Sequence, residues 1–86
     1  MIIKFTKQAD SDLDYFYKSG NKQAVKKIKE LLESIKISPF EGIGQPEPLK
    51  YNLSGTWSRR INGTDRLVYE VEDDIVHILS LKGHYK

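Results

Sequence analysis

The sequence predicts an α+β domain in which a small antiparallel sheet packs against an N-terminal helical hairpin, in the order β-α-α-β-β-β. Three observations predict this class. Apolar residues recur at helical spacing in the first half, all three prolines lie within residues 39–48, and strand-like segments separated by turn residues follow from Trp57. With 86 residues, 38% of them hydrophobic, the chain is expected to form one domain, residues 1–86.

The composition excludes several classes of protein. The chain has no cysteine, which excludes disulfides and thiolate metal sites. The start MIIKF is too short for a secretory or membrane-spanning segment, so a cytoplasmic protein without a membrane partner is expected. The net charge of +2 is too small to predict nucleic-acid binding without knowing where the charges lie.

The N-terminal third predicts a strand followed by a helix. Ile2–Phe5 is apolar and rich in β-branched residues, and Thr6 is a suitable N-cap. The next residues place apolar side chains on one helical face, namely Ala9, Leu13 and Phe16. Acidic residues occupy the other faces, namely Asp10, Asp12 and Asp14. Gly20 is a C-terminal stop, so the first helix is expected to be amphipathic and acidic.

A second helix is predicted between Asn21, a possible cap, and Pro39, which forces an end nearby. Its apolar face has the strongest periodicity in the chain, with Val25, Ile28, Leu32 and Ile35. Lysines dominate its polar face, namely Lys22, Lys26, Lys27, Lys29 and Lys36. This face is either simply solvated or an electrostatic footprint for RNA backbone. The short connection predicts that the two helices pack as an antiparallel hairpin.

The proline-rich loop that follows carries a candidate functional carboxylate. Glu47 lies between Pro46 and Pro48, which restrict its backbone to extended conformations and so lower the entropy lost on fixing its side chain. Glu47 is either a candidate catalytic residue or an ordinary glutamate of a surface turn.

The segment WSRRI-NG-TDRLVYEV predicts a β-hairpin that brings arginines together. A two-residue turn would set Arg59 opposite Arg66, whereas a three-residue loop with Gly63 in a left-handed bulge would set Arg60 there. Facing arginines destabilise a sheet unless they splay into solvent or an anion lies between them. A last strand, Ile75–Leu81, precedes Gly83 and the terminal His84 and Tyr85.

These residue types match the chemistry of RNA cleavage without a metal. That reaction needs a base for the ribose 2′-hydroxyl, cations for the charged phosphorane and an acid for the leaving 5′-oxygen. Glu47 is the candidate base, and Arg66 with Arg60 or Lys50 is the candidate clamp. His84 is the candidate acid, because imidazole titrates near neutrality. Tyr85 would stack on a base or orient the phosphate. No residues have metal-ligand spacing, so no metal or cofactor is predicted, and His77 is interpreted as a structural histidine within a strand.

The order of motifs closely resembles the YoeB toxins of the RelE/ParE superfamily. The resemblance covers nearly the whole chain and rests on FEGIGQPEPLKYNLSGTWSRRI, DRLVYEV and the C-terminal HY. It implies a RelE-like fold and a type II toxin that cuts messenger RNA in the ribosomal A site. It also implies ribosomal RNA as a partner, a YefM-like antitoxin and a homodimer.

The same resemblance implies a role for each candidate residue. Glu47 corresponds to the general base, Arg66 to the transition-state cation and His84 to the general acid, with Tyr85 at the terminal aromatic position. Lys50 and Arg60 match further basic positions, and Arg59 is predicted beside them as a substrate-binding residue. A module that binds RNA or DNA without cutting it, or a silent toxin homologue, is the alternative function.

Overall fold

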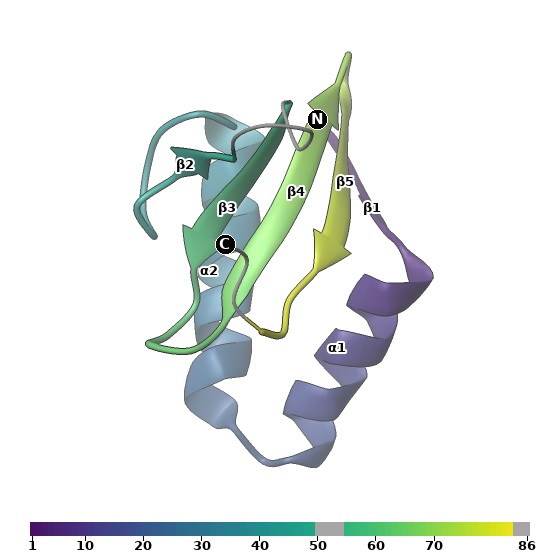
Figure 1. Cartoon of the computed structure of the whole chain (residues 1–86), viewed down its shortest axis with the longest axis vertical. Coiled ribbons are helices and arrows are strands. Elements are labelled where there is room, and N and C mark those ends of the chain that lie inside the picture. The colour runs from purple at the N-terminus through teal and green to yellow at the C-terminus, as the bar shows by residue number, and fades with distance from the viewer. Residues whose placement is uncertain (50–54, 84–86) are drawn as a thin grey trace.

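A computed structural model describes residues 1–49 and 55–83. Two helices and five strands follow one another along the chain: β1 (Ile2–Phe5), α1 (Lys7–Lys18), α2 (Lys22–Ile37), β2 (Glu47–Pro48), β3 (Thr56–Arg60), β4 (Arg66–Glu72) and β5 (Ile75–Ser80). The strands form one sheet in the order β1-β5-β4-β3-β2 (Figure 1). This arrangement confirms the predicted α+β class.

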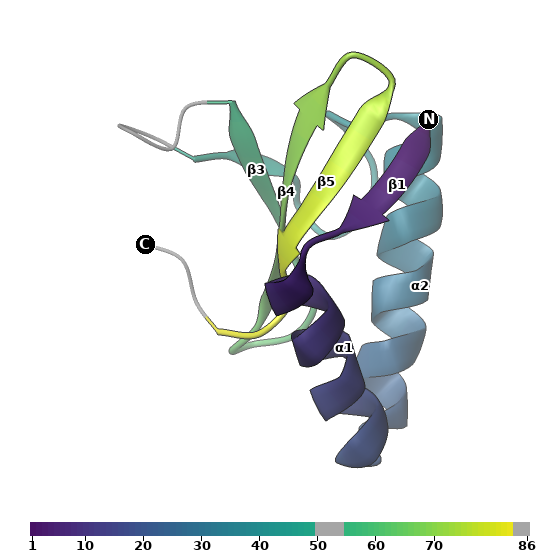
Figure 2. The same ribbon diagram turned by 90° about the vertical axis from the view of Figure 1, so that its right-hand side faces the viewer.

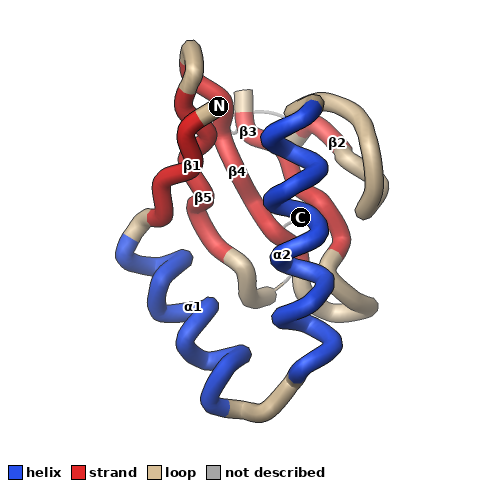
Figure 3. The backbone as a smooth tube through the Cα atoms, turned by 180° about the vertical axis from the view of Figure 1, so that it is seen from behind, coloured by secondary structure: helices blue, strands red, loops and turns tan. Residues whose placement is uncertain are grey.

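The sheet differs from the expected one in that it is mixed. β1 pairs with β5 in parallel, whereas β2, β3, β4 and β5 pair with their neighbours antiparallel. The helical hairpin carries the chain from one edge of the sheet to the other, and the later strands then return to β1 (Figure 3). Parallel pairing follows from this long crossover, which the local pattern of Ile2–Phe5 does not encode.

Both helices begin at the caps that the sequence predicts. The Thr6 hydroxyl accepts a hydrogen bond from the Ala9 amide at 3.1 Å, and the Asn21 side chain accepts one from the Ala24 amide at 3.1 Å. Each cap satisfies an amide that the first helical turn would leave unpaired. Within the described residues, neither helix is both long and apolar enough to cross a membrane.

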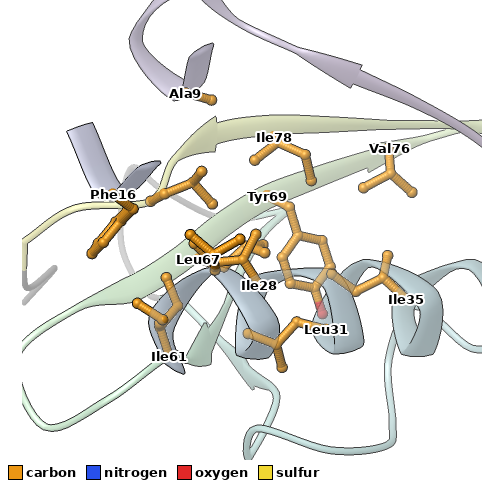
Figure 4. Packing of buried hydrophobic residues seen from close by; sticks show 13 residues of the cluster. Ala9, Phe16, Ile28, Leu31, Ile35, Ile61, Leu67, Tyr69, Val76 and Ile78 are labelled. Carbon is orange, nitrogen blue, oxygen red and sulfur yellow. The ribbon is translucent and has the colours of Figure 1, made fainter. Parts of the chain in front are cut away.

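The core lies between the helices and one face of the sheet (Figures 2 and 4). Leu31 is fully buried there, while Leu32, which its spacing predicts on the apolar face of the helix, is only partly buried and packs at the border of the core. Asp12 is another difference, since it is 5% exposed instead of lying on a solvated face. Tyr69 and Leu67 bring the central strand into this core.

Candidate active site

The face of the sheet that points away from the helices brings together Glu47 and Arg66. β2 pairs Glu47 with Ser58, and β3 pairs Ser58 with Val68, two residues along from Arg66. The Arg66 Nη1 atom lies 3.7 Å from the Glu47 Oε2 atom and 3.4 Å from the Ser58 hydroxyl, to which it donates. The predicted base and the predicted transition-state cation are therefore neighbours.

The two partners of this ion pair differ in exposure. The Glu47 side chain is 61% exposed, whereas that of Arg66 is 13% exposed. A single contact of this length, in which one partner is largely open to water, contributes little stability. The pair therefore costs little to open, and the Arg66 guanidinium can exchange the carboxylate for a phosphate, which binds arginine through charge-assisted hydrogen bonds.

Backbone hydrogen bonds on both sides hold Glu47 in place. The Arg60 amide donates to the Gly44 carbonyl at 2.7 Å, and the Leu49 amide donates to the Thr56 carbonyl at 2.8 Å. Gly44 has a φ of +82°, and its missing side chain leaves room for Leu31 beneath it. The loop is thus fixed to β3 before and after the carboxylate, and the flanking prolines restrict it further.

The hairpin register sets Arg60 opposite Arg66. The three-residue alternative is therefore correct, but Gly63 does not take the left-handed conformation expected for it. Instead, the Asn62 side chain accepts hydrogen bonds from the Thr64 and Asp65 amides, both at 2.8 Å. Arg60 is exposed on the same face as Arg66, so two cations face each other beside Glu47.

Arg59 does not belong to this face, which corrects its prediction as a substrate-binding residue. Its side chain points into the core, where it is 0% exposed. All five of its N–H groups are used, since Arg59 donates to the Tyr69 and Ser34 hydroxyls and to the carbonyls of Ser38, Glu41 and Ile43, at 2.8–3.1 Å. Arg59 therefore fixes the loop that leads to Glu47 and does not contact substrate.

Three of the predicted site residues lie outside the described residues, namely Lys50, His84 and Tyr85. Gly83, the residue that precedes His84 and Tyr85, lies beside the site. The Arg66 amide donates to the Gly83 carbonyl at 3.1 Å, so the last described residue is hydrogen-bonded to the backbone of the candidate transition-state cation.

His77 lies on β5, away from this pair. Its Nε2 atom is 3.5 Å from a Glu72 oxygen, and it faces Glu70 across the sheet. Among residues 1–49 and 55–83, no three histidine, aspartate or glutamate side chains are grouped as ligands of a metal ion. The charged groups that the structure does place on this face suit an anion.

Sequence reasoning missed Ser58, which is fully buried beside Arg66. A signal was available, because strand alternation puts Ser58 and Arg60 on one face and Arg59 on the other. Ser58 gives the guanidinium a neutral hydrogen-bond acceptor in addition to Glu47. Because this hydroxyl is uncharged, it contacts Arg66 without competing with a phosphate for the positive charge of the guanidinium.

Comparison with known proteins places this chain in a family. A family model of YoeB-like toxins of bacterial type II toxin–antitoxin systems matches residues 5–85. The chain belongs to this family. It is 53% identical to Toxin YoeB of Escherichia coli strain K12 over 73 residues, which are 84% of this chain and 87% of the relative. It is 46% identical to Toxin YoeB of Synechocystis over 86 residues, which cover 100% and 99%.

Solved YoeB structures have the same fold. The YoeB dimer from Staphylococcus aureus superimposes with a TM-score of 0.89 at 51% identity, covering 99% of this chain and 98% of the other. The YoeB–YefM complex from the same organism gives 0.86 at 52% identity, with the same coverage. The predicted resemblance is confirmed, and this YoeB-family protein is a toxin of a type II toxin–antitoxin system.

Proposed function

We propose that this toxin is an endoribonuclease that cleaves messenger RNA in the ribosomal A site and thereby stops translation. The observation that carries the proposal is the Glu47–Arg66 pair, a solvent-open carboxylate 3.7 Å from a mostly buried guanidinium. One group suits proton abstraction and the other suits a phosphorane, and RNA cleavage needs both at one phosphodiester.

In the proposed reaction, Glu47 takes the proton from the ribose 2′-hydroxyl, and the resulting oxygen attacks the adjacent phosphorus. Arg66, with Arg60 opposite it, stabilises the added negative charge. His84 gives a proton to the departing 5′-oxygen, Tyr85 supports the base or phosphate, and Lys50 adds a further cation near the substrate. The bond to the 5′-oxygen breaks as the bond to the 2′-oxygen forms, and no metal takes part.

The basic face of α2 supports a ribosomal partner. Lys22, Lys26 and Lys29 are exposed on this helix, which covers one face of the sheet (Figure 2), whereas the Glu47 side chain contacts Arg66 on the other face. Cations there would bind the phosphates of ribosomal RNA while the other face receives the message. This division of surfaces favours a substrate that is presented by the ribosome.

The cellular setting follows from the family. By analogy with the Staphylococcus aureus structures, we propose a homodimer in solution and inhibition by a YefM-like antitoxin. An enzyme that acts on translating ribosomes works in the cytoplasm, which is the proposed location.

The decisive experiment measures single-turnover cleavage of a defined messenger RNA, with and without programmed ribosomes. Wild type is compared with Glu47→Gln, His84→Ala and, as a control, Glu41→Gln, whose side chain is exposed in the same loop. We expect ribosome-dependent cuts that Glu47→Gln slows by roughly 100- to 10,000-fold, the usual contribution of a general base. Binding without cleavage by wild type would instead support the non-catalytic RNA-binding alternative.

A further inference from the structure

The segment that follows β5 is held by carboxylates from two distant parts of the chain. Asp12 of α1 accepts hydrogen bonds at one oxygen from the Leu81 amide at 2.9 Å and the Lys82 amide at 3.3 Å. Its other oxygen accepts one from the Gln8 side chain at 2.8 Å. Asp12 is 5% exposed, so its charge is balanced mainly by these donors.

Asp65, in the β3–β4 turn, holds the next residue. Its Oδ1 atom accepts a hydrogen bond from the Gly83 amide at 2.9 Å, while its Oδ2 atom is oriented by the side chains of Asn62 and Thr64. The Gly83 carbonyl in turn accepts a bond from the Arg66 amide at 3.1 Å. Three consecutive amides, those of residues 81–83, therefore end on carboxylates.

This arrangement exceeds what the end of a strand needs. The Leu81 amide is buried and needs a partner within the protein, but a neutral acceptor would serve at a lower desolvation cost than the charged carboxylate of Asp12. The bond from the Gly83 amide to Asp65 is exposed, so water could have satisfied that amide instead. The bonds place Gly83 against the backbone of Arg66, whose side chain contacts Glu47. Gly83 directly precedes His84, the predicted general acid, in the sequence.

We propose that Asp12 and Asp65 are positioning residues that form a carboxylate clamp, defined as these two side chains and the amides of residues 81–83. The clamp holds the start of the C-terminal segment beside Arg66, so that His84 acts as the acid at the phosphate bound there. This role rests on the proposed ribonuclease function. Neither aspartate contacts the substrate.

The test uses near-isosteric substitutions with matched controls. Asp12→Asn and Asp65→Asn remove the charge of each clamp residue. Asp14→Asn alters an exposed carboxylate on the same helix, which pairs with Lys18, and Asp74→Asn alters an exposed carboxylate in the β4–β5 turn, away from Gly83. The full-length toxin is assayed by ribosome-dependent cleavage and by amide hydrogen exchange at residues 81–83.

We expect each clamp substitution to lower kcat by roughly 10- to 100-fold, because misplacing a reacting group by about 1 Å has effects of this size. KM for ribosomes should change by less than about 2-fold, since the binding faces are intact. Exchange at Leu81 and Lys82 should accelerate in Asp12→Asn, and exchange at Gly83 should accelerate in Asp65→Asn. Both controls should behave as wild type.

A double substitution separates positioning from general damage. If Asp12 acts through His84, adding Asp12→Asn to His84→Ala should lower the residual rate by less than about 2-fold, because groups that act as a unit are non-additive. An undiminished effect of Asp12→Asn in that background, a rise confined to KM, or wild-type rates in both single variants would overturn the clamp. If Asp12→Asn does not fold, Asp65→Asn alone decides, through the same combination with His84→Ala.

Failure of the clamp is distinguishable from failure of the proposed function. If wild type cleaves and the clamp variants cleave equally fast, the clamp alone is wrong. If wild type cleaves no RNA with or without ribosomes, the ribonuclease proposal is wrong and the clamp has no catalytic role, whatever the exchange rates show.

Discussion

Replacing Arg59 by lysine tests whether the fork-shaped guanidinium organises the loop that leads to Glu47. The charge is retained, but a lysine ammonium has three donors on one nitrogen, whereas Arg59 uses five donors spread over three nitrogens. At least two of the acceptors around residue 59 must therefore lose their partner. They are buried or partly buried, so water does not fully replace the lost bonds.

The structure sets the size of the effect. Each buried acceptor left unsatisfied costs about 1–3 kcal/mol, so the loss of two partners in Arg59→Lys should lower the free energy of unfolding by about 2–6 kcal/mol. An 86-residue domain has a total of about 4–13 kcal/mol. The variant should therefore lose a large share of its stability and unfold at a temperature lower by roughly 10–50 °C.

Equilibrium unfolding in urea measures this loss. Trp57 is the single tryptophan of the chain, and its ring centroid lies 5.0 Å from that of Phe40. Because unfolding separates the two rings, the fluorescence of Trp57 reports it. The matched control is Arg60→Lys, the same change at the adjacent exposed position, which should shift stability by less than about 0.5 kcal/mol. Equal midpoints for the two variants would refute the structural role assigned to Arg59.

Two further predictions concern the same part of the fold. Gly44→Ala should destabilise the protein more than Gly20→Ala. Both glycines have a positive φ, but a Cβ at Gly44 would lie 2.5 Å from Leu31 Cδ2, whereas a Cβ at Gly20 would meet no atom within 4 Å. Equal shifts in melting temperature would contradict this prediction. Burial raises the pKa of Tyr69 above its ordinary value of 10.0, against an opposing hydrogen bond and charge from Arg59, so the proton is held more tightly in the folded state. The stability that depends on this proton is complete below about pH 10 and is lost as pH rises through the folded-state pKa. Urea titrations should therefore show that the difference in free energy of unfolding between wild type and Tyr69→Phe shrinks above about pH 10.

The features that the sequence predicted correctly depend on neighbours in the chain. The caps Thr6 and Asn21 bond amides three residues away, and such signals can be read locally. Glu47 and Arg66 were identified by residue type, proline context and family resemblance. Their proximity depends on two strand registers that no local pattern fixes.

The features that were missed depend on distant partners. Asp12 is buried because its acceptor oxygen meets amides 69 and 70 residues later in the chain. Arg59 is buried because carbonyls of the preceding loop surround it, and a side-chain pattern does not reveal backbone acceptors. Polar residues that a sequence places on the surface become structural when the fold supplies buried hydrogen-bond partners.

The hairpin register decides which arginine faces the substrate, and two independent devices fix it. The Asn62 side chain closes a three-residue loop, and the bonds of Arg59 hold β3 from the core side. We expect Asn62→Ala to cost about 1–2 kcal/mol through its two lost backbone bonds while Arg59 preserves the register. Arg60 and Arg66 form a pair whose amides bond elsewhere, so their Cα protons should give a strong cross-strand NOE in both proteins. If Asn62→Ala instead showed this NOE between Arg59 and Arg66, the turn alone would select the arginine that lies at the site.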